Sequence, residues 1–486
     1  MSKIKGFIGE TIVYGFANVF SRAFAMILIP LYTNFLTKVE YSNLSMLQST
    51  FTILSFFLAL NSGVFYYYYE YENVKFKKIV FSTWFFYQIF VCIFLSISVI
   101  FLIPFLEHLF ILNTENTFEI RLGIFLICLQ FLPFIVNNTN INYFRIDRKP
   151  KQVLYIVFAE ALFTFLLIFI SFKITKPSIT IVLVSQIVAR LIVALFSSRT
   201  TLFYARIRLF SKKLLKQIIV ISWPFFIISS LGWAIISLDK FIGVQAFQNQ
   251  SDVAVLTLAT QLIVPLSVLT AMINQAIGPF IMSVRKDTDA NEKFQGVFDL
   301  STFIVIILAL FIITFSPYII LFLSNESFIH AIYVLPLMAL AGIIALVFNQ
   351  ICPSFSLVRK NNIIAVASIS GTAVGLLINF IFMGRYGYVV SGISQVLSYT
   401  VMFLVLYIIG KRKKIIFIQV KNAMLLVFVA VAYITAFYAS NYLWGYGNFI
   451  ISFAISLFFL FLLLVIFLNQ QGIRYSNILQ MVKKIR

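Results

Sequence analysis

A permanent positive charge lies inside an apolar segment near the start of the chain. Arg22 falls near the middle of the stretch 14–36, about 15 Å from the beginning of its helix at 1.5 Å per residue. A guanidinium keeps its proton there, and its exposure to lipid is costly. We therefore expect Arg22 to line a polar cavity and bind an anion, with Asn18 four residues earlier on the same helix face. A structural ion pair is the alternative.

Two further charges form a second interior pair. Glu160 and Arg190 each lie about 15 residues from a predicted turn near 175, so they reach the same depth on antiparallel neighbouring helices. We expect a structural salt bridge between them. The alternative is a transport role, with Glu160 coupling an ion and Arg190 contacting substrate. Gln186 shares the Arg190 face at four-residue spacing.

Other polar groups in apolar segments complete the candidate site. Asp239 and Lys240 are adjacent and diverge around a helix, so they should not pair with each other. Asp239 is the first candidate for a protonatable, ion-coupling group, and Glu70 is the second. Lys240 and Gln48 are candidates for contact with substrate.

Composition places these residues in a membrane protein. The chain has 486 residues, of which 61% are hydrophobic and 11% are charged, and a soluble fold cannot bury so much apolar surface. The net charge of +21 lies in short links between apolar runs, which opposes a nucleic-acid partner. The three cysteines and two histidines form no metal-ligand spacing, and no P-loop or hydrolase motif occurs. We expect no cofactor, no metal and no enzyme activity.

The elements that hold these residues are membrane-spanning helices. Segments of about 20 apolar residues predict an all-α integral membrane protein with about 14 spans. The spans are expected near 11–35, 44–70, 79–106, 121–144, 152–172, 179–203, 217–245, 253–282, 297–323, 329–356, 363–383, 388–410, 422–441 and 446–468.

The distribution of basic residues orients these spans. Most of the 37 Lys and Arg residues lie in one set of loops and in both termini. The opposite loops contain only Lys38, Lys173, Lys176 and Arg385. The excess of basic residues marks the cytoplasmic side, so both termini are expected there, in contact with anionic membrane lipids.

A weak internal repeat predicts two lobes. The segment 184–196 resembles 393–405, and Arg148-Lys149 resembles Arg359-Lys360, each at an offset of about 210 residues. Six intervening spans preserve direction, so the repeat is parallel. We expect two six-helix lobes, 1–210 and 211–412, around a central cavity. A terminal helix pair with a basic cytoplasmic tail should follow at 413–486.

Three segments resemble polysaccharide flippases of the Wzx type. The stretch 10–49 contains the characteristic pairs, with Ser42 where glycine is usual: Tyr14-Gly15, Ser21-Arg22, Pro30-Leu31 and Glu40-Tyr41. The segment 359–399 and the "LDKFIG" of 238–243 are also similar to the family.

The resemblance implies a member of the multidrug/oligosaccharidyl-lipid/polysaccharide exporter superfamily in a bacterial inner membrane. The implied activity is translocation of an undecaprenyl-pyrophosphate-linked oligosaccharide, such as an O-antigen or capsule unit, by alternating access that an ion gradient drives. Polysaccharide polymerase and chain-length proteins are implied partners. The alternatives are a drug or cation antiporter of the same superfamily, a membrane glycosyltransferase or polymerase, and a structural scaffold. Short outward loops oppose the enzyme, and a buried Arg22 opposes the antiporter and the scaffold.

Overall fold

The computed structural model is helical in every region that it describes. These regions are 24–58, 60–70, 74–104, 117–147, 149–246, 251–284, 290–358, 360–413, 415, 419–444 and 449–470, and they contain no strand. Contacts divide the chain into two compact units, Met1–Thr257 and Leu258–Arg486.

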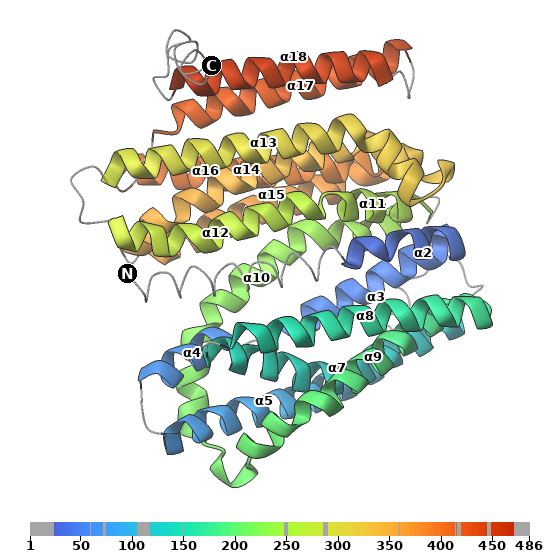
Figure 1. Ribbon diagram of the computed structural model, residues 1–486, viewed down its shortest axis with the longest axis vertical. Coiled ribbons are helices and arrows are strands. Elements are labelled where there is room, and N and C mark those ends of the chain that lie inside the picture. Colours follow the sequence, from blue (N-terminus) through green and yellow to red (C-terminus); the bar gives the residue numbers. More distant parts are fainter. Residues whose placement is uncertain are drawn as a thin grey trace, which may run out of the picture. The chain divides into compact units, whose positions relative to one another are not determined.

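Unit 1 (Met1–Thr257) is a bundle of long helices that run alongside one another (Figure 1). Its elements are α2 (Ile29–Phe35), α3 (Lys38–Phe56), α4 (Asn61–Glu70), α5 (Val74–Phe101), α7 (Thr117–Ile146), α8 (Pro150–Ile174), α9 (Ile179–Tyr204), the 3-10 turn η2 (Ile207–Leu209) and α10 (Lys212–Ala246). Helix α10 belongs to this unit because it packs against α3, α4 and α5.

Unit 2 (Leu258–Arg486) is a second helical bundle, and α11 (Ser251–Leu262) crosses into it. Its other elements are α12 (Val264–Val284), α13 (Ala290–Leu323), the 3-10 helix η3 (Glu326–Tyr333), α14 (Leu335–Leu357), α15 (Asn361–Tyr386), α16 (Val389–Arg412), α17 (Lys421–Trp444) and α18 (Phe449–Gln470). The parallel repeat and the lobe boundaries at 210 and 412 stay predictions.

The number of apolar helices agrees with about 14 spans. Among the described residues, 11 helices are long and apolar enough to cross a membrane, and α11 with α12 makes a twelfth, bent by 41°. Pro265 follows this bend, where it removes one backbone donor. The predicted span 44–70 is divided between α3 and α4, and only Phe24–Phe35 of the span 11–35 is described.

Local hydrogen bonds fix how the helices of unit 1 begin and meet. Thr37 and Glu40 form a reciprocal capping box at the start of α3, which accounts for the acidic residue before Tyr41. The Ser222 hydroxyl of α10 donates to the Leu60 carbonyl and accepts from the Gly63 amide of α4. These bonds hold the broken second span against α10.

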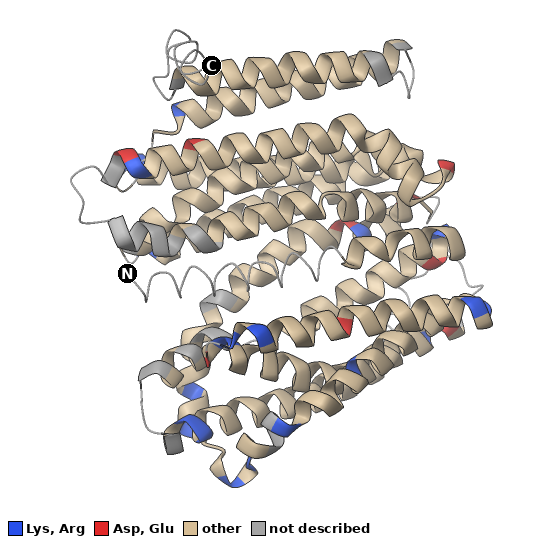
Figure 2. Ribbon diagram, viewed as in Figure 1, with Lys and Arg blue, Asp and Glu red and all other residues tan. Residues whose placement is uncertain are grey.

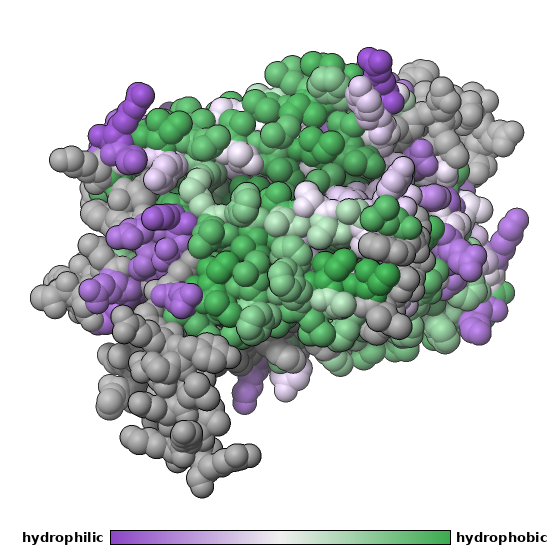
Figure 3. Space-filling view, turned by 90° about the horizontal axis from the view of Figure 1, so that it is seen from above, coloured by the Kyte–Doolittle hydropathy of each residue, from purple (hydrophilic) through white to green (hydrophobic). Residues whose placement is uncertain are grey.

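The surface of the helices is suited to lipid. Large apolar side chains are widely exposed, including Phe94 (69%) and Leu195 (73%) of unit 1 and Phe380 (70%) of unit 2. Lys and Arg gather toward helix ends and loops (Figure 2). The face in Figure 3 has a hydrophobic middle and hydrophilic residues at its ends. Multiple apolar helices with this surface define a multi-pass membrane protein.

Candidate functional site

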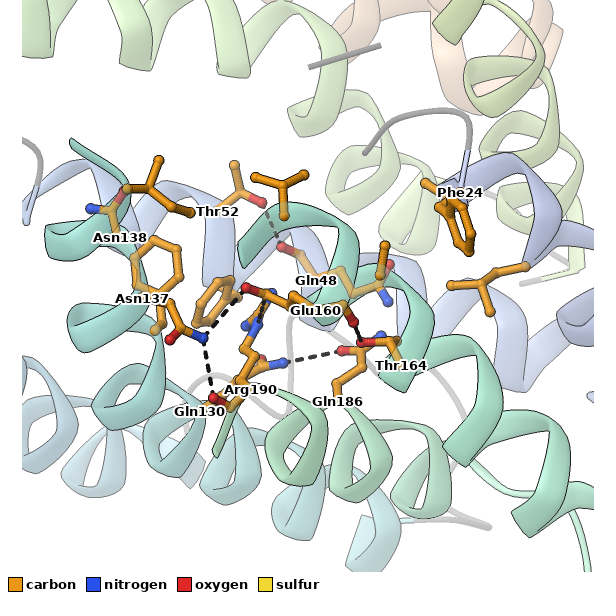
Figure 4. Close-up of a pocket in the computed structure, with 17 residues that line it drawn as sticks. Phe24, Gln48, Thr52, Gln130, Asn137, Asn138, Glu160, Thr164, Gln186 and Arg190 are labelled. Atoms are coloured by element: carbon orange, nitrogen blue, oxygen red, sulfur yellow. Dashed lines mark hydrogen bonds and ion pairs between the residues drawn. The ribbon is translucent and has the colours of Figure 1, made fainter. Parts of the chain in front are cut away.

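A polar cavity of about 440 Å³ lies inside unit 1. Four helices, α3, α7, α8 and α9, and the segment before α2 supply its walls (Figure 4). The lining consists of Phe24, Ala25, Leu28, Gln48, Phe51, Thr52, Gln130, Phe134, Asn137, Asn138, Ile141, Val157, Glu160, Ala161, Thr164, Gln186 and Arg190. On each helix these residues recur at three- or four-residue spacing, so each helix contributes one face.

An ion pair crosses this cavity between α8 and α9. Arg190 Nε donates to Glu160 Oε1 at 2.8 Å, and the two side chains are 20% and 24% exposed. The contact confirms the expected salt bridge between these residues. Arg190 Nη1 is buried without a hydrogen-bond partner among the described residues.

Amide side chains extend the ion pair into a network. Asn137 Nδ2 donates to Glu160 Oε2 at 3.5 Å and to the Arg190 carbonyl at 3.1 Å. Gln130 Nε2 donates to Gln186 Oε1 at 3.1 Å. Gln130 and Asn137 of α7 are only 3% and 1% exposed. Because buried amides are fixed by such bonds, these two hold a preset orientation toward the cavity.

Aromatic rings provide the apolar wall of the cavity. The Arg190 guanidinium carbon lies 4.9 Å from the centre of the Phe51 ring and 5.7 Å from that of Phe134. The two rings meet edge to face at 5.2 Å. Cation–π contact therefore stabilises the Arg190 side chain in addition to its carboxylate partner.

The predicted site residues fall into three groups. Gln48, Glu160 and Arg190 line the cavity together with Gln186. Arg22 and Asn18 lie outside the described residues.

The third group is Asp239, Lys240 and Glu70, which are not among the residues that line the cavity. Lys240 Nζ donates to Ser45 Oγ at 3.1 Å, and the Lys240 amide donates to Asp239 Oδ1 at 2.8 Å. Asp239 is fully buried and Lys240 is 6% exposed, and the bond to Ser45 places the Lys240 side chain in the contact between α10 and α3. Glu70 is the last residue of α4, and its side chain is outside the described part of the structure.

Sequence reasoning missed Gln130, Asn137, Asn138 and the aromatic wall. A signal was present, because Gln130, Phe134, Asn137 and Ile141 recur at helical spacing within one apolar span. From the sequence, the amides Asn18, Gln48 and Gln186 were named, but not those of the span 121–144.

Comparison with protein families found one matching model, described as "Polysaccharide biosynthesis protein". It matches residues 8–285, which is more than half of the chain and includes every residue of the cavity. A search of curated proteins found no significant match.

Comparison with solved structures identified the fold. A structure titled "Lipid II flippase MurJ, inward closed conformation" is similar with a TM-score of 0.72 and 15% identity, covering 95% of this chain and 99% of that one. An inward-facing multidrug resistance MATE family transporter of the MOP superfamily has a TM-score of 0.66 and 14% identity, covering 83% and 98%. An outward-facing one has a TM-score of 0.59 and 15% identity, covering 84% and 95%.

Proposed function

Because the chain belongs to the polysaccharide biosynthesis protein family, we propose that it is a flippase for a lipid-linked oligosaccharide. The substrate is an undecaprenyl-pyrophosphate-linked oligosaccharide that moves from the cytoplasmic to the outer leaflet of a bacterial inner membrane. O-antigen and capsule units are examples. The fold that the chain shares with MurJ and MATE structures supports alternating access as the mechanism.

One observation carries this proposal, namely a polar cavity within an apolar helical unit. A lipid-linked oligosaccharide has a head that needs hydrogen bonds and a tail that prefers lipid. Amide and charged side chains in the cavity replace water around the head, while exposed apolar side chains such as Phe94 and Leu195 suit the tail.

Arg22 is proposed to bind the pyrophosphate. Phosphate oxygens accept paired hydrogen bonds from a guanidinium. Asn18 and Lys240 are proposed as further substrate contacts. Asp239, Glu70 and Glu160 remain the proposed ion-coupling groups, and the basic loops predict that both termini are cytoplasmic.

A cation antiporter is the second candidate because MATE structures share the fold. Glu160 is the only carboxylate among the described residues that line the cavity, and it is paired with Arg190 at 2.8 Å. A cationic drug would have to displace this guanidinium. The pairing therefore favours the flippase.

Deletion of the gene tests the flippase proposal in cells. The expected result is accumulation of single lipid-linked repeat units that face the cytoplasm, measured by extraction and labelling of the lipid intermediates. Normal export of repeat units in the deletion strain would refute it.

Complementation with Arg22→Ala and Arg22→Lys tests the role of the buried cation. Arg22→Ala should abolish export at normal protein abundance, and Arg22→Lys should keep part of it because the charge remains. Normal export with Arg22→Ala would remove this residue from the mechanism.

A further inference from the structure

The cavity of unit 1 is charge-balanced among its described residues. Its lining contains one carboxylate and one guanidinium, Glu160 and Arg190, joined at 2.8 Å. An anionic ligand that reaches the unpartnered Nη1 of Arg190 would lie beside the Glu160 carboxylate and be repelled by it. A like charge at such short range disfavours a second anion in a partly buried site. The cavity is therefore poorly suited to a charged group.

The remaining polar lining is suited to hydroxyl groups. A hydroxyl both donates and accepts, and a side-chain amide offers two donors and one acceptor. One N–H of the Gln130 side chain donates to Gln186, which leaves the side-chain carbonyl oxygen and the second N–H of Gln130 for a ligand. Gln48 lines the cavity, and the described part of the chain provides no hydrogen bond to its side-chain amide.

The aromatic lining and the volume fit a ring with an apolar face. Phe24, Phe51 and Phe134 lie on the walls, and a pyranose ring presents C–H groups that pack on aromatic side chains. A volume of about 440 Å³ lies within the range of small-molecule pockets. It is large enough for a sugar ring.

From these features we infer that this cavity is a subsite for an uncharged sugar ring of the glycan. The Glu160–Arg190 pair is its specificity-determining element, because it cancels the charge that would attract an acidic sugar. The inference rests on the proposed flippase function. It separates the binding of the sugar from that of the pyrophosphate, which the proposal assigns to Arg22.

Two matched substrates test the inference with the full-length protein in proteoliposomes. The probes are polyprenyl-pyrophosphate-linked glucose and glucuronic acid, which differ only at C6, where glucuronic acid has a carboxylate in place of a hydroxymethyl group. A native lipid-linked oligosaccharide is the third substrate. Wild-type protein should flip the glucose probe at least about tenfold faster than the glucuronic acid probe, since a buried charge without a partner is disfavoured.

Variants of the pair then change the preference. Glu160→Gln leaves the guanidinium uncompensated and should reverse the preference toward glucuronic acid. The double variant Glu160→Arg/Arg190→Glu restores a neutral pair and should restore the preference for glucose. Glu326→Gln, which neutralises an exposed carboxylate outside the cavity, should resemble wild type.

The outcomes separate the inference from the proposed function. Equal rates for the two probes, or faster flipping of glucuronic acid by wild type, would overturn the inference while native substrate still moves. Failure to flip either probe while native substrate moves would also overturn it. If native substrate does not move, the flippase proposal fails and the inference fails with it. The wild-type comparison needs no variant, so a misfolded variant does not prevent the test.

Discussion

The Glu160–Arg190 pair should stabilise unit 1, and a double-mutant cycle measures its contribution. The two side chains are 20% and 24% exposed, so most of their charge is shielded from water. Arg190→Met leaves Glu160 unpaired and loses the contacts with Phe51 and Phe134. Leaving Glu160 unpaired costs about 3 kcal/mol and losing the ring contacts costs about 0.5–1 kcal/mol, which gives a loss of about 3.5–4 kcal/mol.

The double variant should lose less stability than the sum of the two single variants. Glu160→Gln keeps an oxygen for Asn137 and leaves Arg190 over its two rings, so we expect a loss of about 2 kcal/mol. The double variant buries no unpaired charge, and we expect a coupling energy of about 2 kcal/mol. Unfolding of purified protein in mixed detergent micelles, followed by circular dichroism, gives all four values. A coupling energy below about 0.5 kcal/mol would show that the two side chains do not stabilise each other.

Two further substitutions test the packing of the helices. Gly375→Leu should lower stability by about 1–3 kcal/mol, because even a Cβ at this position of α15 would overlap the Ser398 side chain of α16. Thermal unfolding measures this loss. The control is Gly296→Ala, where a Cβ would meet nothing within 4 Å, and it should be neutral or slightly stabilising. A neutral Gly375→Leu would contradict the close packing of α15 on α16. Ser222→Ala removes the bonds to the Leu60 carbonyl and the Gly63 amide and should speed amide exchange at Gly63, with a loss of about 1 kcal/mol. Unchanged exchange at Gly63 would count against this link.

Much of the fold could be predicted because membrane spans are local features of the sequence. Each predicted span after the second, from 79 to 468, matches one apolar helix or the bent pair α11 and α12. The division of 44–70 into α3 and α4 was not predicted, since both pieces are equally apolar. Bonds from Ser222, far along the chain, hold the second piece.

The site was predicted only where depth alone decides which residues meet. Glu160 and Arg190 lie on consecutive helices joined by a short turn, so equal distance from the turn brought them together. The bond from Gln130 to Gln186 depends on how α7 and α9 rotate against each other, and one sequence does not give that rotation. The same limit applies to Lys240, whose partner Ser45 lies 195 positions away.

Transfer of a lipid-linked oligosaccharide between leaflets by the purified protein is the most direct test of its function. The measurement follows labelled substrate in proteoliposomes, using a membrane-impermeant reagent that modifies only the outer-leaflet population. We expect the protein to make the inner-leaflet population accessible with time, and Arg22→Ala to slow this transfer. Accessibility identical to that of protein-free liposomes, with correctly folded protein and native substrate, would contradict it.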